Sequence, residues 1–205
     1  MKSASNLIEG LKSLPHFSKD SVHQLGKQLG LSDVTINTYI SRFLKRRQLY
    51  PLKRGLYVPV DFFEKNRHDA SYAFYLANVI RVPSYISSWS ALQHYDLTTE
   101  AIRTITCVTP KVTRTYQTKV GTFAYQSING ELFHGFALVK GTFEFFIASP
   151  SKALFDLLYF RTRQFRGISM NDIMVLIREL RIDFEEMEAS EQKKFYALIT
   201  PYVHE

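Results

Sequence analysis

The stretch that most constrains the fold is Ser32–Arg47, with the sequence SDVTINTYISRFLKRR. On a helix that turns about 100° per residue, its large apolar side chains fall on one side. Small hydroxyls and cations fall on the other side, so the segment is predicted to be a helix with one core face and one basic face. The apolar side comprises Ile36, Tyr39, Ile40, Phe43 and Leu44, and the polar side comprises Thr35, Thr38, Ser41, Arg42 and Lys45.

Two shorter helices are predicted upstream of this segment. The first is Asn6–Leu14, which has clustered Leu and Ile side chains and ends before Pro15, a residue that cannot continue a helix. The second begins at Ser18, in SKDSVHQLGKQLGL, and is closed by Gly30, since glycine readily takes the left-handed conformation that ends a helix. Its predicted inward side chains are Val22, Leu25 and Leu29.

A hairpin is predicted immediately downstream of the long helix. Leu49–Leu52 and Leu56–Val60 are short β-type runs, and Lys53, Arg54 and Gly55 separate them. Two helices joined by a tight glycine turn and followed by a hairpin with a basic tip indicate a winged helix-turn-helix, in which the hairpin is the wing.

Positive charge is concentrated in the first 60 residues. They contain ten Lys or Arg and three Asp or Glu, so their net charge of +7 equals that of the whole chain. Residues 61–205 hold 16 basic and 16 acidic residues. Because a protein that contacts a duplex gains affinity by releasing counterions from the phosphates, this module is predicted to bind double-stranded DNA.

The predicted DNA contacts lie on the long helix, the hairpin tip and the start of the preceding helix. In the major groove, Arg and Lys reach guanine edges, and hydroxyls reach phosphates or bases. The wing cations would lie along the backbone or in the minor groove. A helix N-terminus also holds phosphate, although capping explains Ser18 equally well. The predicted DNA-binding residues are Lys19, Thr35, Thr38, Ser41, Arg42, Lys45, Arg46, Lys53 and Arg54.

The pattern changes after the hairpin. The polar stretch at 61–69 is predicted to link a domain at 1–60 to a second domain at 70–205. The predicted fold class is α+β: an N-terminal winged helix-turn-helix, then a C-terminal α+β domain with a small, mostly antiparallel sheet flanked by helices. The predicted helices of the second domain are 71–80, 87–97, 150–160, 170–180 and 191–202, and the predicted strands are 104–108, 121–128, 132–139 and 142–147.

The residue types needed for catalysis or metal binding are not arranged in any familiar motif. The six histidines form no HExxH or HxH pattern, and Thr109 stands two residues before Lys111, where a nuclease would need an acid. The chain has no GxxxxGK loop and no GxSxG elbow, and its single cysteine, Cys107, forms no internal disulfide. We therefore expect no catalytic residue, no metal and no cofactor.

The lengths of the hydrophobic runs and the N-terminal sequence indicate where in the cell the protein is expected. No apolar run approaches the roughly 18 residues of a membrane span, and the first residues lack the apolar core of a signal peptide. We therefore expect a cytoplasmic protein without a membrane partner.

Blocks along most of the chain, from about Ser18 to about Phe160, resemble the AbiEi family of antitoxins. The blocks are the N-terminal module followed by PSYISSWSALQHYDLTTE, ITCVTPK, GTFAYQSI, FHGF and IASPSKALFDLLYF, and their order carries the resemblance. The family comprises the transcriptional regulators of type IV toxin-antitoxin systems, encoded beside a nucleotidyltransferase toxin. Two positions depart from the pattern: Ser151 replaces a glutamate, and Tyr95 replaces a glycine.

The resemblance implies a winged helix-turn-helix that binds repeats in its own promoter and represses the operon. It also implies a C-terminal domain that opposes a nucleotidyltransferase toxin without forming a stable complex with it. The expected partners are therefore double-stranded operator DNA and, functionally, the toxin.

Two other classes of function stay open on the sequence. The C-terminal domain could belong to a DNA-processing enzyme, which a plasmid-nicking assay with Mg²⁺ and Mn²⁺ would detect. Alternatively, the basic N-terminus could serve a protein-interaction adaptor that binds an acidic partner, in which case DNA would not compete.

Overall fold

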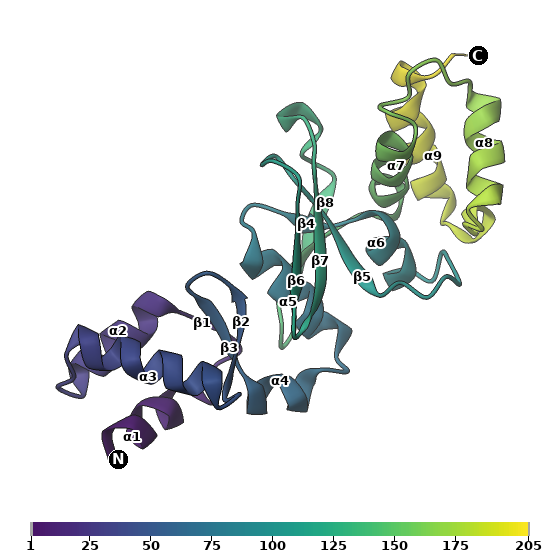
Figure 1. Cartoon of the computed structure of the whole chain (residues 1–205). Coiled ribbons are helices and arrows are strands. Elements are labelled where there is room, and N and C mark those ends of the chain that lie inside the picture. The colour runs from purple at the N-terminus through teal and green to yellow at the C-terminus, as the bar shows by residue number, and fades with distance from the viewer. Residues whose placement is uncertain (1, 205) are drawn as a thin grey trace. The chain divides into compact units, whose positions relative to one another are not determined.

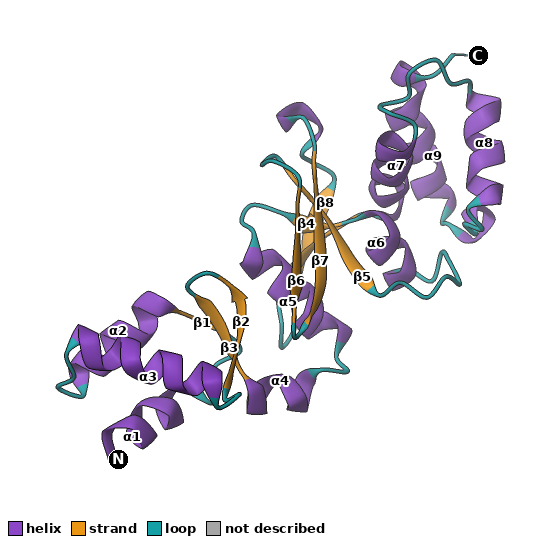
Figure 2. Ribbon diagram, viewed as in Figure 1, coloured by secondary structure: helices purple, strands orange, loops and turns teal. Residues whose placement is uncertain are grey.

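The computed structural model describes residues 2–204, with side chains from Ala4 onward. The α+β class is confirmed: helices alternate with a three-stranded antiparallel sheet near the N-terminus and a six-stranded mixed sheet further along the chain (Figures 1 and 2). The chain divides into two compact units, each with its own core. We call Met1–Leu76 with Tyr116–Thr122 the first unit, and Ala77–Thr115 with Phe123–Glu205 the second unit.

The first unit begins with three helices and a small sheet. The predicted helices and hairpin are confirmed, and a strand that the sequence pattern did not predict, β1, joins the sheet. This strand has only two residues and pairs with β3, with Phe17 opposite Tyr57 and Ser18 opposite Leu56, giving the order β1-β3-β2. The elements are α1 (Lys2–Leu11), β1 (Phe17–Ser18), α2 (Lys19–Gln28), α3 (Asp33–Lys45), β2 (Leu49–Lys53) and β3 (Leu56–Pro59).

One core unites these elements. The predicted inward face of α3 is largely buried, because its spacing matches the helical period. Leu29 differs from the prediction: it is the C-cap residue of α2 and its side chain is 39% exposed. The buried cluster consists of Leu7, Ile8, Leu11, Phe17, Val22, Ile36, Ile40, Phe43, Leu49 and Tyr57.

A glycine allows α2 and α3 to approach closely. A Cβ atom on Gly26 would come within 2.5 Å of Ile36 Cδ1 and 2.6 Å of Ile36 Cγ1, and the Ile36 side chain is fully buried. The Gly26→Ala variant should therefore lose about 1 kcal/mol or more of unfolding free energy, because overpacking outweighs the gain in helix propensity. Urea denaturation measures this change.

Gly130 supplies the matched control for that prediction. A Cβ atom added there meets no atom within 4 Å, so Gly130→Ala should leave the stability nearly unchanged. Equal stabilities of the Gly26→Ala variant and the unmodified chain would contradict the close contact between α2 and α3.

The segment 61–69, predicted to be a polar linker, is largely helical. The helix α4 (Val60–Asn66) follows β3 directly. Phe63 lies 6.0 Å from Tyr50 and Phe62 lies 5.5 Å from Tyr72, measured between ring centroids. These two aromatic contacts hold the segment on the first unit, whose first stretch extends to Leu76.

The six-stranded sheet has the strand order β6-β7-β5-β4-β9-β8, and its β4–β9 pairing is parallel. Strands β4 and β6 were not predicted, because β4 has two residues and β6 is a polar edge strand without apolar alternation. The helices α6 and α9 pack against α7. The elements are α5 (Ala70–Ile80), β4 (Tyr85–Ile86), α6 (Ser88–His94), β5 (Thr104–Thr109), β6 (Arg114–Thr118), β7 (Gly121–Ser127), β8 (Phe136–Val139), β9 (Phe145–Ala148), α7 (Pro150–Arg161), α8 (Met170–Glu179) and α9 (Ala189–Ile199).

A buried ion pair lies at the centre of the second unit. Lys152 and Asp156 form it one turn apart on α7, and both are at most 1% exposed. The second carboxylate oxygen of Asp156 accepts hydrogen bonds from Ser87 Oγ at 2.7 Å and Tyr85 Oη at 3.0 Å. Burial raises the pKa of the Asp156 carboxyl, while Lys152 and these two hydroxyls act in the opposite direction. The four side chains join α7 to the β4 segment.

A second polar cluster joins α7 to α9. The backbone N–H and the hydroxyl of Ser151 donate to Glu191 Oε2 at 3.0 and 2.7 Å, and Lys194 Nζ lies 2.6 Å from Glu191 Oε1. Burial of Glu191 acts to raise its pKa, but the hydrogen bonds from Lys194 and Ser151 prevail and lower it to about 2. At the position where the resemblance expects a glutamate, Ser151 thus binds a carboxylate from another helix.

This depressed pKa predicts an acid-dependent contribution to stability. The carboxylate stabilises the fold fully above its ordinary pKa of 4.5, and the contribution is lost as the pH falls towards about 2. Glu191→Gln should cost about 1–2 kcal/mol at pH 7, because solvent around the exposed Lys194 weakens its ion pair with Glu191, and much less at pH 3. Urea denaturation of both proteins at the two pH values tests this, and an equal difference at pH 7 and pH 3 would contradict it.

Candidate nucleic-acid interface

The outward face of α3 is exposed along its length. Ser32 caps the helix and accepts a hydrogen bond from Thr35 N at 3.3 Å. Ile36 and Ile40 are at most 4% exposed, so the opposite side of the helix faces solvent. The residues on that side are Val34, Thr38, Ser41 and Lys45, which are spaced at helical intervals and are all exposed.

The predicted hydroxyl residues are not equivalent in the structure. Thr35 is half-buried, and its Oγ1 lies 2.9 Å from Ser32 Oγ in the capping turn. Thr38 is exposed but donates its hydroxyl to the backbone oxygen of Val34 at 2.9 Å, which leaves its lone pairs as acceptors. Ser41 is exposed at the middle of the face. Thr38 and Ser41 are therefore available to a ligand, whereas Thr35 acts mainly in capping.

Val34 was missed by the sequence reasoning. Its side chain is 76% exposed near the start of α3, four residues before Thr38 on the same side of the helix. The contacts predicted on this helix were all polar residues. The apolar Val34, one turn before Thr38, was therefore not among them. An exposed valine supplies the methyl groups that contact thymine in a major groove.

Arg42 and Arg46 lie on one flank of α3, towards α1. Both line a small cavity of ≈ 230 Å³ with Ser5 and Ile8 of α1. The Arg42 guanidinium lies 6.0 Å from the centre of the Tyr39 ring, within the range of a cation–π contact. Both arginines are exposed, so this flank adds positive charge beside the central face.

The start of α2 and the hairpin tip are brought together by the backbone. Lys19 N donates to Gly55 O at 2.8 Å, and Gly55 has a φ of 77°, which favours glycine at this turn. Ser18 caps α2 by accepting from Ser21 N at 3.0 Å, so its hydroxyl serves the cap. Lys19 and Arg54 are exposed, and Lys53 is partly exposed. The structure thus places the predicted Lys19, Lys53 and Arg54 in one region.

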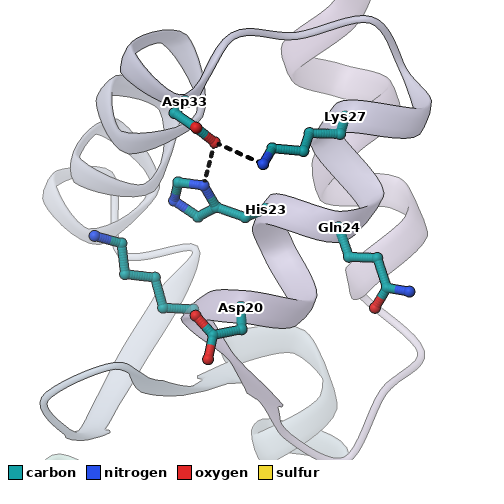
Figure 3. A pocket seen from close by; sticks show the side chains of 6 residues that line it. Asp20, His23, Gln24, Lys27 and Asp33 are labelled. Atoms are coloured by element: carbon teal, nitrogen blue, oxygen red, sulfur yellow. Dashed lines mark hydrogen bonds and ion pairs between the residues drawn. The ribbon is translucent and has the colours of Figure 1, made fainter.

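A polar network fixes α2 against α3 (Figure 3). His23 Nδ1 lies 2.8 Å from Asp33 Oδ1, and His23 Nε2 lies 3.1 Å from the side-chain oxygen of Asn37. Lys27 Nζ lies 3.6 Å from the same Asp33 oxygen. The hydrogen bond from His23 is the main reason that the pKa of Asp33 is lowered. The network holds the start of α3 in a fixed orientation.

The hollow beside this network has a mixed charge. Its volume is ≈ 620 Å³, and two lysines and two aspartates contribute to its lining (Figure 3). Because the formal charges of the two lysines and the two aspartates cancel, the hollow has no excess of positive charge to attract an anion. The lining residues are Lys19, Asp20, His23, Gln24, Lys27 and Asp33.

Five of the cations predicted to contact DNA are exposed and have no acidic partner. Within residues 4–204, no Asp or Glu side chain lies within ion-pair distance of any of them. Cations without internal partners keep their full charge for external phosphates. We call these residues the five cations: Lys19, Arg42, Lys45, Arg46 and Arg54.

The remaining features concern metals, membranes and relatives. Within the described part of the chain, no group of three or more His, Cys, Asp or Glu is placed to hold a metal ion. No helix formed by residues 2–204 has both the length and the apolar character needed to cross a bilayer.

No protein-family model matches the chain, and a search of curated proteins finds no significant match.

Proposed function

We propose that the first unit is a winged helix-turn-helix that binds operator DNA, with α3 as the recognition helix. The observation that carries the proposal is the group of five cations, which are exposed, without internal ion pairs, and divided between α3, the start of α2 and the hairpin tip. Phosphate neutralisation requires cations of this kind on adjoining elements.

The face of α3 has the chemistry of a groove-reading helix. Thr38, Ser41 and Lys45 offer hydrogen-bonding groups to base edges or phosphates, and Val34 offers methyl groups to thymine. Arg42 on the flank is positioned for the backbone that borders the groove.

The hairpin would act as the wing. Its tip is bonded to the start of α2 through Lys19 N and Gly55 O, which keeps the backbones that carry Lys19 and Arg54 close together. In this mode they contact the phosphate backbone, and Arg54 enters the minor groove.

We further propose that the whole protein is the autorepressor and antitoxin of a type IV toxin-antitoxin system, as the resemblance to the AbiEi family implies. Bound to an operator that overlaps its promoter, the protein would exclude RNA polymerase. The second unit would oppose a nucleotidyltransferase toxin without a stable complex. These roles place it in the cytoplasm, with no catalytic activity of its own.

A mobility-shift titration on the DNA upstream of the protein's own gene, against a scrambled duplex, tests the DNA-binding proposal. With about five to eight phosphates neutralised, affinity should fall by about 10³-fold or more between 50 and 200 mM salt. The full chain should prefer the upstream DNA. A flat salt dependence, or equal binding to the scrambled duplex, would overturn the proposal.

A further inference from the structure

The second unit contains a cavity that the proposed DNA binding does not use. Its volume is ≈ 420 Å³, within the range of about 300–1,000 Å³ typical of small-molecule sites. One wall is the sheet, where Thr106, Thr115 and Gln126 contribute from β5, β6 and β7. The Thr106 hydroxyl already donates to Ser87 O and accepts from Ser90 N, so Thr115 and Gln126 are the polar side chains that this wall offers to a ligand.

A second group of lining residues is apolar and aromatic. Trp89 comes from α6, and Leu157 and Phe160 come from the end of α7. Trp89 is only half-buried and is the only tryptophan in the chain. The Trp89 indole and the Phe160 ring form a surface on which a flat heterocycle can stack. Polar side chains of the sheet wall can then form hydrogen bonds with its edge groups.

Among the described residues, Arg161 is the only charged one that lines the cavity. It is exposed, and no acidic side chain of the described residues lies within ion-pair distance of it. Two more exposed arginines, Arg163 and Arg166, follow within five residues. The cavity therefore favours an anionic ligand, and an arginine fork suits phosphate or carboxylate oxygens.

A strained residue marks the same cavity. Ser88 lines it with a φ of 53°, a left-handed conformation that costs a non-glycine residue about 1–3 kcal/mol. Its hydroxyl is buried and, within the described part of the chain, has no hydrogen-bond partner. Strain and an unpaired buried hydroxyl at one position both point to a function other than folding stability.

We propose that this cavity binds a nucleotide, with the base against Trp89 and Phe160 and the phosphate on Arg161. The aromatic wall accounts for the base, the threonine and glutamine side chains for its hydrogen-bonding edges, and the arginine for the phosphate. A purely apolar ligand would offer no hydrogen-bond partner to Gln126 or Arg161, and a cation would be repelled by Arg161.

Because Trp89 is the only tryptophan, its fluorescence reports directly on this site. The full chain is titrated with nucleoside monophosphates and triphosphates of the four bases, with the free nucleosides and with inorganic phosphate. We expect saturable quenching by a nucleotide below about 1 mM, and weaker binding of the nucleoside and of phosphate alone. A short oligonucleotide in a parallel titration separates a free nucleotide from the terminal nucleotide of a nucleic acid.

Arg161→Ala should weaken nucleotide binding by about tenfold or more, because a charge-assisted hydrogen bond is lost. Arg178→Ala, which removes an exposed arginine of α8 outside the cavity lining, should bind as the unmodified chain does. No saturable signal with any nucleotide, equal binding by the Arg161→Ala variant, or equal binding of phosphate alone would overturn the proposal.

This proposal stands apart from DNA recognition. A variant with reversed charges at Arg42 and Lys45 in the first unit should retain full nucleotide binding, because neither residue lines the cavity. Loss of nucleotide binding in that variant would contradict the assignment of the site to the second unit.

Discussion

Arg42→Glu combined with Lys45→Glu is expected to weaken operator binding by more than about 100-fold at low salt. Each substitution removes a cation from the face or flank of α3 and places a carboxylate where a phosphate or guanine acceptor would lie. Because two contacts are lost and two repulsions are gained, the effect should exceed that of deleting either side chain. A mobility-shift titration on the upstream DNA measures the loss.

The fold should survive these substitutions. Both side chains are exposed, and the described residues give neither an acidic partner. Arg42 would lose one cation–π contact with Tyr39, worth about 0.5–1 kcal/mol at an exposed site. Both positions lie in the last turn of α3, so a carboxylate there costs about 0.3–1 kcal/mol against the helix dipole.

A matched control carries the same change in net charge elsewhere. Arg178→Glu with Lys193→Glu alters two exposed residues of the second unit and should leave most of the operator affinity intact. A collapsed thermal transition in the Arg42 and Lys45 variant would contradict the exposed placement. Equal losses of affinity in the two variants would show that net charge, and not the face of α3, controls binding.

Asp156→Ala is expected to produce the largest loss of stability, about 3–5 kcal/mol. It leaves the Lys152 ammonium buried without its carboxylate, 4.9 Å from the Phe155 ring and 6.0 Å from the Tyr85 ring. It also removes the acceptor of Ser87 Oγ and Tyr85 Oη. Urea denaturation of the full chain, followed by circular dichroism, measures the change.

The double variant Lys152→Met with Asp156→Leu tests the cause of that loss. Replacing both charges by apolar side chains of similar size removes the uncompensated ammonium, so much of the lost stability should return. Lys193→Met is the control for removing a lysine: its side chain is exposed and, among the described residues, no acidic group lies within ion-pair distance of it, so its effect should be small. A double variant as unstable as Asp156→Ala would show that the hydroxyl contacts, and not the buried charge, dominate.

The candidate interface was predictable where it depends on local periodicity. The face of α3 follows from helical spacing, and the cations Lys45 and Arg54 follow from a helix end and a hairpin tip. The same spacing did not show that the hydroxyl of Thr35 is engaged in capping. That difference arises because Ser32 competes for it through a specific hydrogen bond.

The larger omissions involve residues that are distant in the sequence. Strand β1 exists because it pairs with β3, about 40 residues later, and its two residues carry no pattern of their own. The composition of the helix at 60–66 is polar and typical of a linker, whereas its two phenylalanines pack on Tyr50 and Tyr72. Composition gives only the average polarity of a segment, whereas packing depends on individual side chains such as Phe62 and Phe63.

The sequence by itself determined the α+β class, the three N-terminal helices, the hairpin and the positions of its cations, because each depends on contacts a few residues apart. Only the tertiary structure decided which distant side chains meet: Lys19 with the hairpin tip, Ser151 with Glu191, and Arg161 with Trp89 around one cavity. Such contacts require chain folding over many residues, and their geometry has no local signature in the sequence.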